Sequence, residues 1–313
     1  MKKVLILTLV IALAMLIAVP SFAEAGKTLK VAYIPNSMSN ESLAYAYREM
    51  ERMAPDYNIE MTAFDGQYDP QIEVRNFTNC IAQEFDAIIT TPSDISAIVP
   101  SIMEASEKGI IVGMFSADLN DDFKEFRTFF VGVDDTTAGE AAGEAFKAQF
   151  PDGAKVVEIG GQAGTDAQNK RHDGFTAAIE GSNIEVIGYQ ACNAWSTSEA
   201  MSIMEDFITK YGSEIQGVYC HWDNGATGCI EALKNANIEG TYVVAVDGCR
   251  AGFDQVKAGT QSVCISQDFS KQAQKILEVV RKVADGEEFE VVNYIPLDVV
   301  TPENVDTFAY PEW

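Results

Sequence analysis

The sequence predicts an α/β protein built from two Rossmann-like lobes with parallel sheets and a ligand site in the cleft between them. Short strand-like segments alternate with helical segments throughout residues 28–295, which is typical of parallel strands joined by right-handed crossovers. Segments such as residues 86–90 lack polar alternation, as expected of strands buried on both faces. The strands are too numerous for one compact sheet and form two similar halves, with a boundary near Val133 and Asp134.

Residues 1–23 are predicted to be a secretory signal peptide. Two lysines follow the first methionine, residues 4–19 are almost purely apolar, and small residues precede the expected cleavage after Ala23. The apolar run is shorter than the ~20 residues that a membrane-spanning helix needs, so an anchor is disfavoured. We therefore expect a soluble protein located in the periplasm.

Charge and cysteine content exclude some functions. The net charge is −25, and such acidity argues against a nucleic-acid partner because phosphate binding requires a basic face. Export permits disulfides, and the six cysteines are expected to be mostly structural, with at most one or two bridges. They lack the spacing of a zinc site, so we expect neither a metal nor a cofactor.

The first half is predicted to hold five strands, at residues 28–34, 59–64, 86–90, 109–115 and 128–133. Helices are predicted between them at residues 41–54, 70–82 and 95–108. The first helix carries apolar side chains at Leu43, Tyr47 and Met50, spaced by three and four residues as on one helix face. Ser39 or Asn40 can cap this helix, and aspartates precede the next two.

The same alternation resumes after Asp134. Strands are predicted at residues 155–159, 185–190, 217–220, 242–246 and 262–266. Helices are predicted from Asp134 to about Phe150 and at residues 166–179, 196–211, 225–235 and 251–257. A last helix over residues 270–284 ends at Gly286, and a last strand lies near residues 291–295.

Polar and aromatic side chains follow the strands at their carboxyl ends, where parallel sheets bind ligands. Two sheets with facing carboxyl ends would form a small-molecule site between the lobes. A sugar or polyol suits this mixture, because its hydroxyls pair with amides, carboxylates and guanidinium while its C–H faces lie against rings. The predicted site residues are Asn36, Ser39, Asn40, Ser93, Phe115 and Ser116 in the first half, and Arg171, Trp195, Trp222, Asp223, Asp247 and Gln267 in the second.

Several of these positions also have ordinary structural explanations. Arg171 could form a surface salt bridge, and both tryptophans could simply close the core. Asp223 could act only as a helix cap, and Gln267 could be a turn residue. Their joint placement at the carboxyl ends of strands favours a binding site.

The glycines after residue 159 offer an alternative, a nucleotide-phosphate cradle in an enzyme. Gly160, Gly161 and Gly164 are expected to turn the chain tightly before the helix that carries Arg171. The acidic residue that a dinucleotide loop needs after the next strand is absent, and Gln190 stands there. No Walker lysine or G-x-S-x-G elbow occurs, and the chain has only two histidines. We therefore expect a binding protein and not an enzyme.

Six segments, in this order and spacing, carry a family resemblance. They are residues 64–70 (FDGQYDP), 85–94 (FDAIITTPSD), 139–143 (GEAAG), 161–175, 244–248 (VAVDG) and 300–305 (VTPENV). Together they resemble the ribose/galactose-type periplasmic solute-binding proteins of ABC sugar importers, which have the type I periplasmic-binding-protein fold. The resemblance covers essentially all of the mature chain.

The resemblance implies two lobes joined by a three-crossover hinge, which close over one ligand. The lobes would be residues 24–133 plus 268–296 and residues 134–267 plus 297–313. The implied partners are a sugar or polyol and an ABC permease in the inner membrane. The family also contains binders of a furanone-type signalling molecule, so a ligand-binding sensor subunit that contacts a chemoreceptor or sensor kinase is the alternative. Repressors share the fold, but here an export signal replaces their DNA-binding helices.

The resemblance also implies roles for single residues. Arg171 falls on a ligand-binding arginine, Asp247 on an aspartate that pairs with sugar hydroxyls, and Gln267 on a polar contact at a crossover. Trp195 falls on an aromatic residue that stacks on the sugar. Two places depart from the family pattern: Trp222-Asp223 replaces Asn-Asp, and Phe115-Ser116 replaces Asp-Arg. A more aromatic, less charged site is therefore expected, suited to another monosaccharide, a deoxy or amino sugar, or a polyol.

Overall fold

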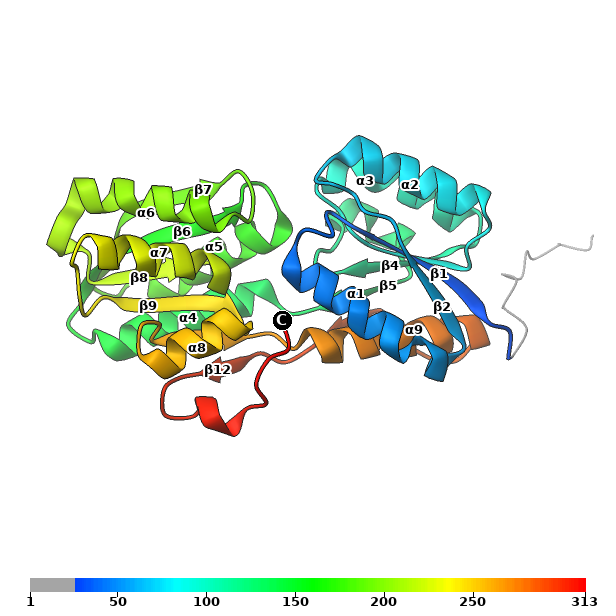
Figure 1. Ribbon diagram of the computed structural model, residues 1–313. Coiled ribbons are helices and arrows are strands. Elements are labelled where there is room, and N and C mark those ends of the chain that lie inside the picture. Colours follow the sequence, from blue (N-terminus) through cyan, green and yellow to red (C-terminus); the bar gives the residue numbers. More distant parts are fainter. Residues whose placement is uncertain (1–25) are drawn as a thin grey trace, which may run out of the picture.

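The computed structural model describes residues 26–313, and the predicted signal peptide lies outside them. Figure 1 shows two lobes side by side, each with helices on both faces of a sheet. Within residues 26–313, no helix has the length and apolar character needed to cross a membrane.

The sheet of the first lobe has six strands, and every pairing in it is parallel. In spatial order they are β11 (Val292–Tyr294), β5 (Phe129–Gly132), β4 (Ile111–Phe115), β3 (Ala87–Thr91), β1 (Leu29–Pro35) and β2 (Ile59–Ala63). The first-lobe helices are α1 (Glu41–Met53), α2 (Pro70–Ala82), α3 (Ile95–Glu107) and α9 (Phe269–Asp285), with 3-10 turns at Ala54–Tyr57 and Asp121–Phe126. One core lies between the sheet and α1 and α9, and a second lies under α2 and α3.

The second lobe repeats this architecture. Its spatial strand order is β12 (Asp298–Val300), β10 (Val263–Ser266), β9 (Tyr242–Asp247), β8 (Gly217–Cys220), β6 (Ala154–Gln162) and β7 (Ile184–Cys192). Its helices are α4 (Asp135–Gln149), α5 (Asp166–Ile179), α6 (Thr197–Tyr211), α7 (Asp223–Asn235) and α8 (Arg250–Ala258), with 3-10 turns at Gly212–Glu214 and Val305–Thr307. Cores lie under α6 and α7 on one face and under α4 and α5 on the other.

The chain passes between the two sheets three times, after β5, after β10 and between β11 and β12. The predicted α/β class with two lobes and a three-crossover hinge is thereby confirmed. Local sequence explains where the helices begin and end. Asp94 and Asp134 cap α3 and α4 by accepting the N–H groups of Ala97 and Thr136, and Gly286 ends α9 with a left-handed φ of 72°.

Two local details differ from the sequence prediction. β12 pairs antiparallel with β10, and its three residues are too few to produce a recognisable strand pattern. Strand β6 continues through Gly160 and Gly161, which were expected to form a turn, and only Gly164 takes a left-handed φ, of 84°. Glycine is needed at position 161 because the Trp195 ring occupies the space of a Cβ atom, whereas a Cβ atom on Gly160 would make only a tight contact of 3.1 Å with Ala191.

All six cysteines are buried and free. Five of them, all except Cys249, pack in the hydrophobic cores, as small buried thiols usually do. Within the described residues, no cluster of histidine, cysteine and carboxylate side chains has the arrangement of a metal site.

Candidate functional site

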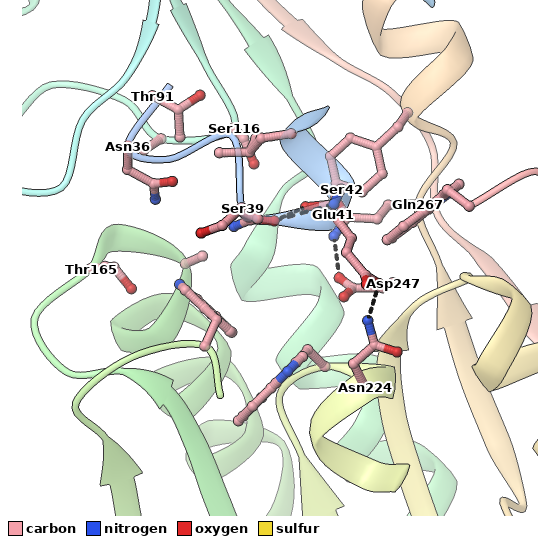
Figure 2. A pocket seen from close by; sticks show the side chains of 18 of the residues that line it. Asn36, Ser39, Glu41, Ser42, Thr91, Ser116, Thr165, Asn224, Asp247 and Gln267 are labelled. Atoms are coloured by element: carbon pink, nitrogen blue, oxygen red, sulfur yellow. Dashed lines mark hydrogen bonds between the residues drawn. The ribbon is translucent and has the colours of Figure 1, made fainter. Parts of the chain in front are cut away.

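A cavity of about 210 Å³ lies between the lobes, at the carboxyl ends of their strands. It is smaller than the ~300–1,000 Å³ of sites for drug-sized molecules, and therefore suits a small ligand. Figure 2 shows Asn36, Thr91 and Ser116 of the first lobe on the opposite side of the cavity from Thr165 and Asn224 of the second. A ligand held here would contact both lobes at once.

The structure brings together nine of the twelve predicted site residues. The residues that line the cavity are Asn36, Ser39, Asn40, Ser116, Arg171, Trp195, Trp222, Asp247 and Gln267. The remaining three, Ser93, Phe115 and Asp223, do not line it, for reasons given below.

Arg171, on α5, is a buried cation at the cavity. It therefore does not form the surface salt bridge that the sequence left open as an alternative. Its Nε donates to Asp135 Oδ1 at 2.8 Å, and its Nη1 donates to the carbonyl oxygen of His221. Nη1 also lies 3.8 Å from Asp247 Oδ1. Because Arg171 and Asp135 are each only 4% exposed in their side chains, this ion pair is held in a fixed orientation at the cavity wall.

Asp247, the last residue of β9, and Gln267 supply hydrogen-bond acceptors to the site. Gln267 donates its Nε2 to Asp247 Oδ1 at 2.8 Å, while the buried Oε1 of Gln267 has no hydrogen-bond partner. Burial raises the pKa of Asp247 to about 7, although the nearby Arg171 opposes this. Asp247 also has a φ of 130°, and Ser116 across the cavity has a φ of 60°, so two lining residues hold strained backbone conformations.

Aromatic rings form much of the remaining wall. All three tryptophans of the chain, Trp195, Trp222 and Trp313, line the cavity. The rings of Trp195 and Trp222 are perpendicular with centroids 5.3 Å apart, and the Arg171 guanidinium lies 5.8 Å from the Trp195 ring centroid. A Cβ on Gly161 would stand 2.1 Å from Trp195 ring carbons, so this glycine makes room for the ring.

The first lobe contributes amides and hydroxyls from the loop before α1. Asn36 Oδ1 accepts the N–H of Ser37 at 2.6 Å, which directs the Asn36 side chain. Asn40 caps α1 through the N–H of Ser42. Glu41, in the first turn of α1, accepts a 2.8 Å hydrogen bond from Asn224 of the second lobe (Figure 2), so a direct bond crosses the cleft at this point.

Asp223 lies behind the cavity wall and not in it. Its Oδ2 accepts the N–H groups of Gly248 and Cys249 at 2.7 and 3.2 Å, and its Oδ1 accepts from Gln261 at 2.8 Å. The side chain is fully buried, and a Cβ on Gly252 would stand 2.2 Å from it. Asp223 therefore supports the turn that follows Asp247.

We expect Asp223→Asn to lower the free energy of unfolding by about 3 kcal/mol or more, because each buried donor left without an acceptor costs about 1–3 kcal/mol. The amide group cannot accept where the second carboxylate oxygen did. Urea unfolding of the variant and the wild-type protein measures the difference. Equal stabilities would show that Asp223 does not support this turn.

Ser93 and Phe115 are also misplaced in the sequence prediction. Phe115 ends β4 with its ring in the first-lobe core, edge-on to Phe269 with centroids 6.3 Å apart, and the next residue is the one that reaches the cavity. Ser93 donates its hydroxyl to Glu73 at 2.5 Å. Burial raises the pKa of Glu73 to about 7, with the bonds from Ser93 opposing the shift.

The sequence prediction missed a second set of lining residues. They are Glu41, Ser42, Leu43, Thr91, Ala117, Thr165, Ala167, Thr197, Asn224, Phe269 and Trp313. Most of them stand at the end of a strand or in the first turn of the following helix, so a wider window around each strand end would have found them. Trp313 follows no strand, and its place in the site had no local signal.

Neither histidine lines the cavity, and both contact the same buried carboxylate. His172 Nδ1 and His221 Nε2 are each 2.9 Å from Glu158 Oε1. His221 is fully buried, and burial lowers its pKa although Glu158 opposes this. Among residues 26–313, the cavity lining contains no histidine or cysteine. The lining side chains can form hydrogen bonds with a ligand or pack aromatic rings against it.

Comparison with known proteins agrees with this geometry. A ribose import binding protein of Salmonella typhimurium is 25% identical over 300 residues, covering 96% of this chain and 98% of that protein. A xylitol-binding protein of Mycolicibacterium smegmatis is 25% identical over 258 residues, covering 82% of this chain and 73% of that protein. A Bacillus halodurans ABC transporter solute-binding protein, solved with bound myo-inositol, superposes with a TM-score of 0.83 at 27% identity and covers 90% and 97% of the two chains.

The family model described as a periplasmic binding protein domain matches residues 31–288. This match includes five strands of each sheet, every residue that lines the cavity except Trp313, and two of the three crossovers. The chain therefore belongs to the periplasmic binding protein family.

Proposed function

We propose that this protein is the periplasmic substrate-binding component of an ABC importer and captures a monosaccharide or a sugar-like polyol. The observation that carries the proposal is the cavity between the lobes, lined from both sides by amides, hydroxyls, one buried arginine–aspartate set and three tryptophans. Relatives named for ribose and xylitol binding, and one solved with myo-inositol, support the same ligand class.

In the proposed mechanism, the ligand first meets one lobe and the second lobe then closes over it. Asp247 Oδ2 and Gln267 Oε1 accept hydrogen bonds from ligand hydroxyls, and Arg171 donates to a ligand oxygen. The ligand favours closure by the extent to which it binds the closed form better than the open form.

The lobes that move are residues 24–133 plus 268–296 and residues 134–267 plus 297–313. The three crossovers between the sheets form the hinge, and the Glu41–Asn224 bond adds to the closed form. The closed form would dock on the membrane permease, and a chemoreceptor or sensor kinase would recognise the same form.

A thermal-unfolding screen tests the proposal. The mature protein is heated with pentoses, hexoses, amino sugars and polyols, because a ligand at 100 times its Kd adds about 2.7 kcal/mol of apparent stability. We expect at least one sugar or polyol to raise the melting temperature saturably and to be recovered unchanged. No stabilisation by any member, or conversion of the bound compound to a product, would contradict the proposed function.

A further inference from the structure

The last residues of the chain cross from the second lobe to the first beside the hinge. The Arg250 N–H, at the start of α8, donates to the carbonyl oxygen of Trp313 at 2.6 Å, and the Arg250 Nε donates to that of Pro311 at 3.1 Å. The Tyr310 hydroxyl lies 3.0 Å from both carboxylate oxygens of Asp254, also on α8. The backbone of this segment is therefore attached to the second lobe, and Figure 1 shows it ending between the lobes.

The ring of Trp313 instead packs on the first lobe. It lies nearly parallel to the Tyr45 ring of α1, with centroids 6.0 Å apart and an interplanar angle of 17°. It is perpendicular to the Phe269 ring at the start of α9, with centroids 5.1 Å apart. One side chain thus joins the two lobes next to the β10–α9 crossover.

Trp313 also separates two cavities. The candidate ligand cavity measures about 210 Å³, and a larger cavity of about 560 Å³ lies on the other side. Within residues 26–313, the residues that line both cavities are Gln267, Phe269 and Trp313 alone. Gln267 is hydrogen-bonded to Asp247 and Phe269 is buried in the first-lobe core, so both are fixed at the crossover. The partly exposed Trp313 forms the rest of the wall between the two cavities.

We propose that Trp313 is a specificity-determining residue whose ring closes the hinge-side wall of the site and limits it to ligands of about one sugar ring. The inference rests on the proposed function, since it specifies the size of ligand that the site accepts. A substituent on the bound sugar ring would contact the indole of Trp313 before it reached the larger cavity.

The larger cavity could hold such a substituent if the indole were absent. Its lining combines aromatic and other apolar side chains with ionisable ones, which are Glu49, Arg52, Asp268, Lys271, Asp298, Tyr45, Tyr310 and Glu312. Four carboxylates against two cations favour a neutral, hydroxyl-rich extension over an anionic one. A second sugar ring has this chemistry.

Paired affinities for small and large ligands test the inference. The wild-type protein, Trp313→Ala and Trp313→Phe are titrated calorimetrically with the monosaccharide that stabilises the wild type most and with a neutral disaccharide containing that ring. Tyr57→Phe is the matched control, because Tyr57 is an aromatic residue that lines neither cavity. Trp313→Phe retains most of the aromatic wall, so it still tests the inference if Trp313→Ala folds poorly.

We expect the wild type to prefer the monosaccharide at least tenfold. In Trp313→Ala the monosaccharide affinity should fall by up to about tenfold, the scale of one lost aromatic contact, while the disaccharide affinity rises. Trp313→Phe should be intermediate, and Tyr57→Phe should keep the wild-type ratio. An unchanged ratio in Trp313→Ala, an equal change in Tyr57→Phe, or a wild type that prefers the disaccharide would overturn the inference alone. A wild type that binds no sugar or polyol would refute the proposed function, and the inference with it.

Discussion

Arg171→Met is expected to lower the free energy of unfolding by about 3–5 kcal/mol, because removing one partner of a buried ion pair leaves an uncompensated charge. Asp135 and Asp247 would both face the cavity wall without their cation. Ligand-dependent stabilisation should also be lost, since a charge-assisted hydrogen bond contributes about 1.5–3 kcal/mol to binding. Chemical unfolding, with and without the stabilising sugar or polyol, measures both effects.

Lys170→Met is the matched control. It removes the same charge from the adjacent residue, whose Nζ forms a 2.7 Å, partly exposed salt bridge with Asp166. Pairs of this kind contribute about 0–1 kcal/mol, so stability and ligand response should stay close to those of the wild type. If both variants lost stability equally, net charge and not the buried Arg171 network would be responsible.

Asp247→Asn is expected to have opposite effects on stability and on binding. The variant should be more stable than the wild type at pH 8, by an amount that approaches about 4 kcal/mol at most, since each pKa unit corresponds to about 1.36 kcal/mol. Ligand affinity should fall in the same variant, because the amide replaces the charged acceptor. Such a trade-off between stability and function is common at binding sites.

The sign of this pH effect follows from the raised pKa of Asp247, which burial moves from 3.8 to about 7. A carboxyl group with a raised folded-state pKa contributes its stability fully below about pH 3.8 and loses it as the pH rises through about 7. The asparagine variant lacks this loss. The stability difference between the two proteins should therefore grow from pH 4 to pH 8.

The other charged groups around Asp247 are retained in that variant. Arg171, Asp135 and Asp223 affect the pKa of Asp247, and Gln267 can still donate to the asparagine oxygen. Urea unfolding at several pH values, for the wild type and the variant, separates the contribution of Asp247 from those of its neighbours. A stability difference that stays constant from pH 4 to pH 8 would contradict the raised pKa.

The sequence predicted the second-lobe side of the cavity better than the first-lobe side. Arg171, Asp247 and Gln267 follow buried strands or stand in the first turns of a helix, where parallel topology places them at one edge. Phe115 was wrongly predicted to reach the cavity, because the strand continues through it and the unusual φ of the next residue redirects the chain. Local pattern does not predict such a positive φ at a serine.

Long-range contacts set the limit of prediction from this sequence. Trp313 reaches the site only because residues on α8 hold its backbone and rings on α1 and α9 hold its indole. Asp223 looked like a ligand contact or a cap, and its true partners lie on a distant turn and strand. The glycines after residue 159 suggested a phosphate cradle, whereas Gly161 leaves space for Trp195.

Acrylamide quenching of tryptophan fluorescence tests the central claim, that a small ligand binds in the cavity between the lobes. All three tryptophans line that cavity, so the fluorescence comes entirely from the site. We expect the stabilising sugar or polyol to reduce quenching saturably, with the same midpoint as its effect on melting temperature. A compound that stabilises the protein but leaves tryptophan emission and quenching unchanged must bind elsewhere, and that result would rule out the cavity between the lobes as its binding site.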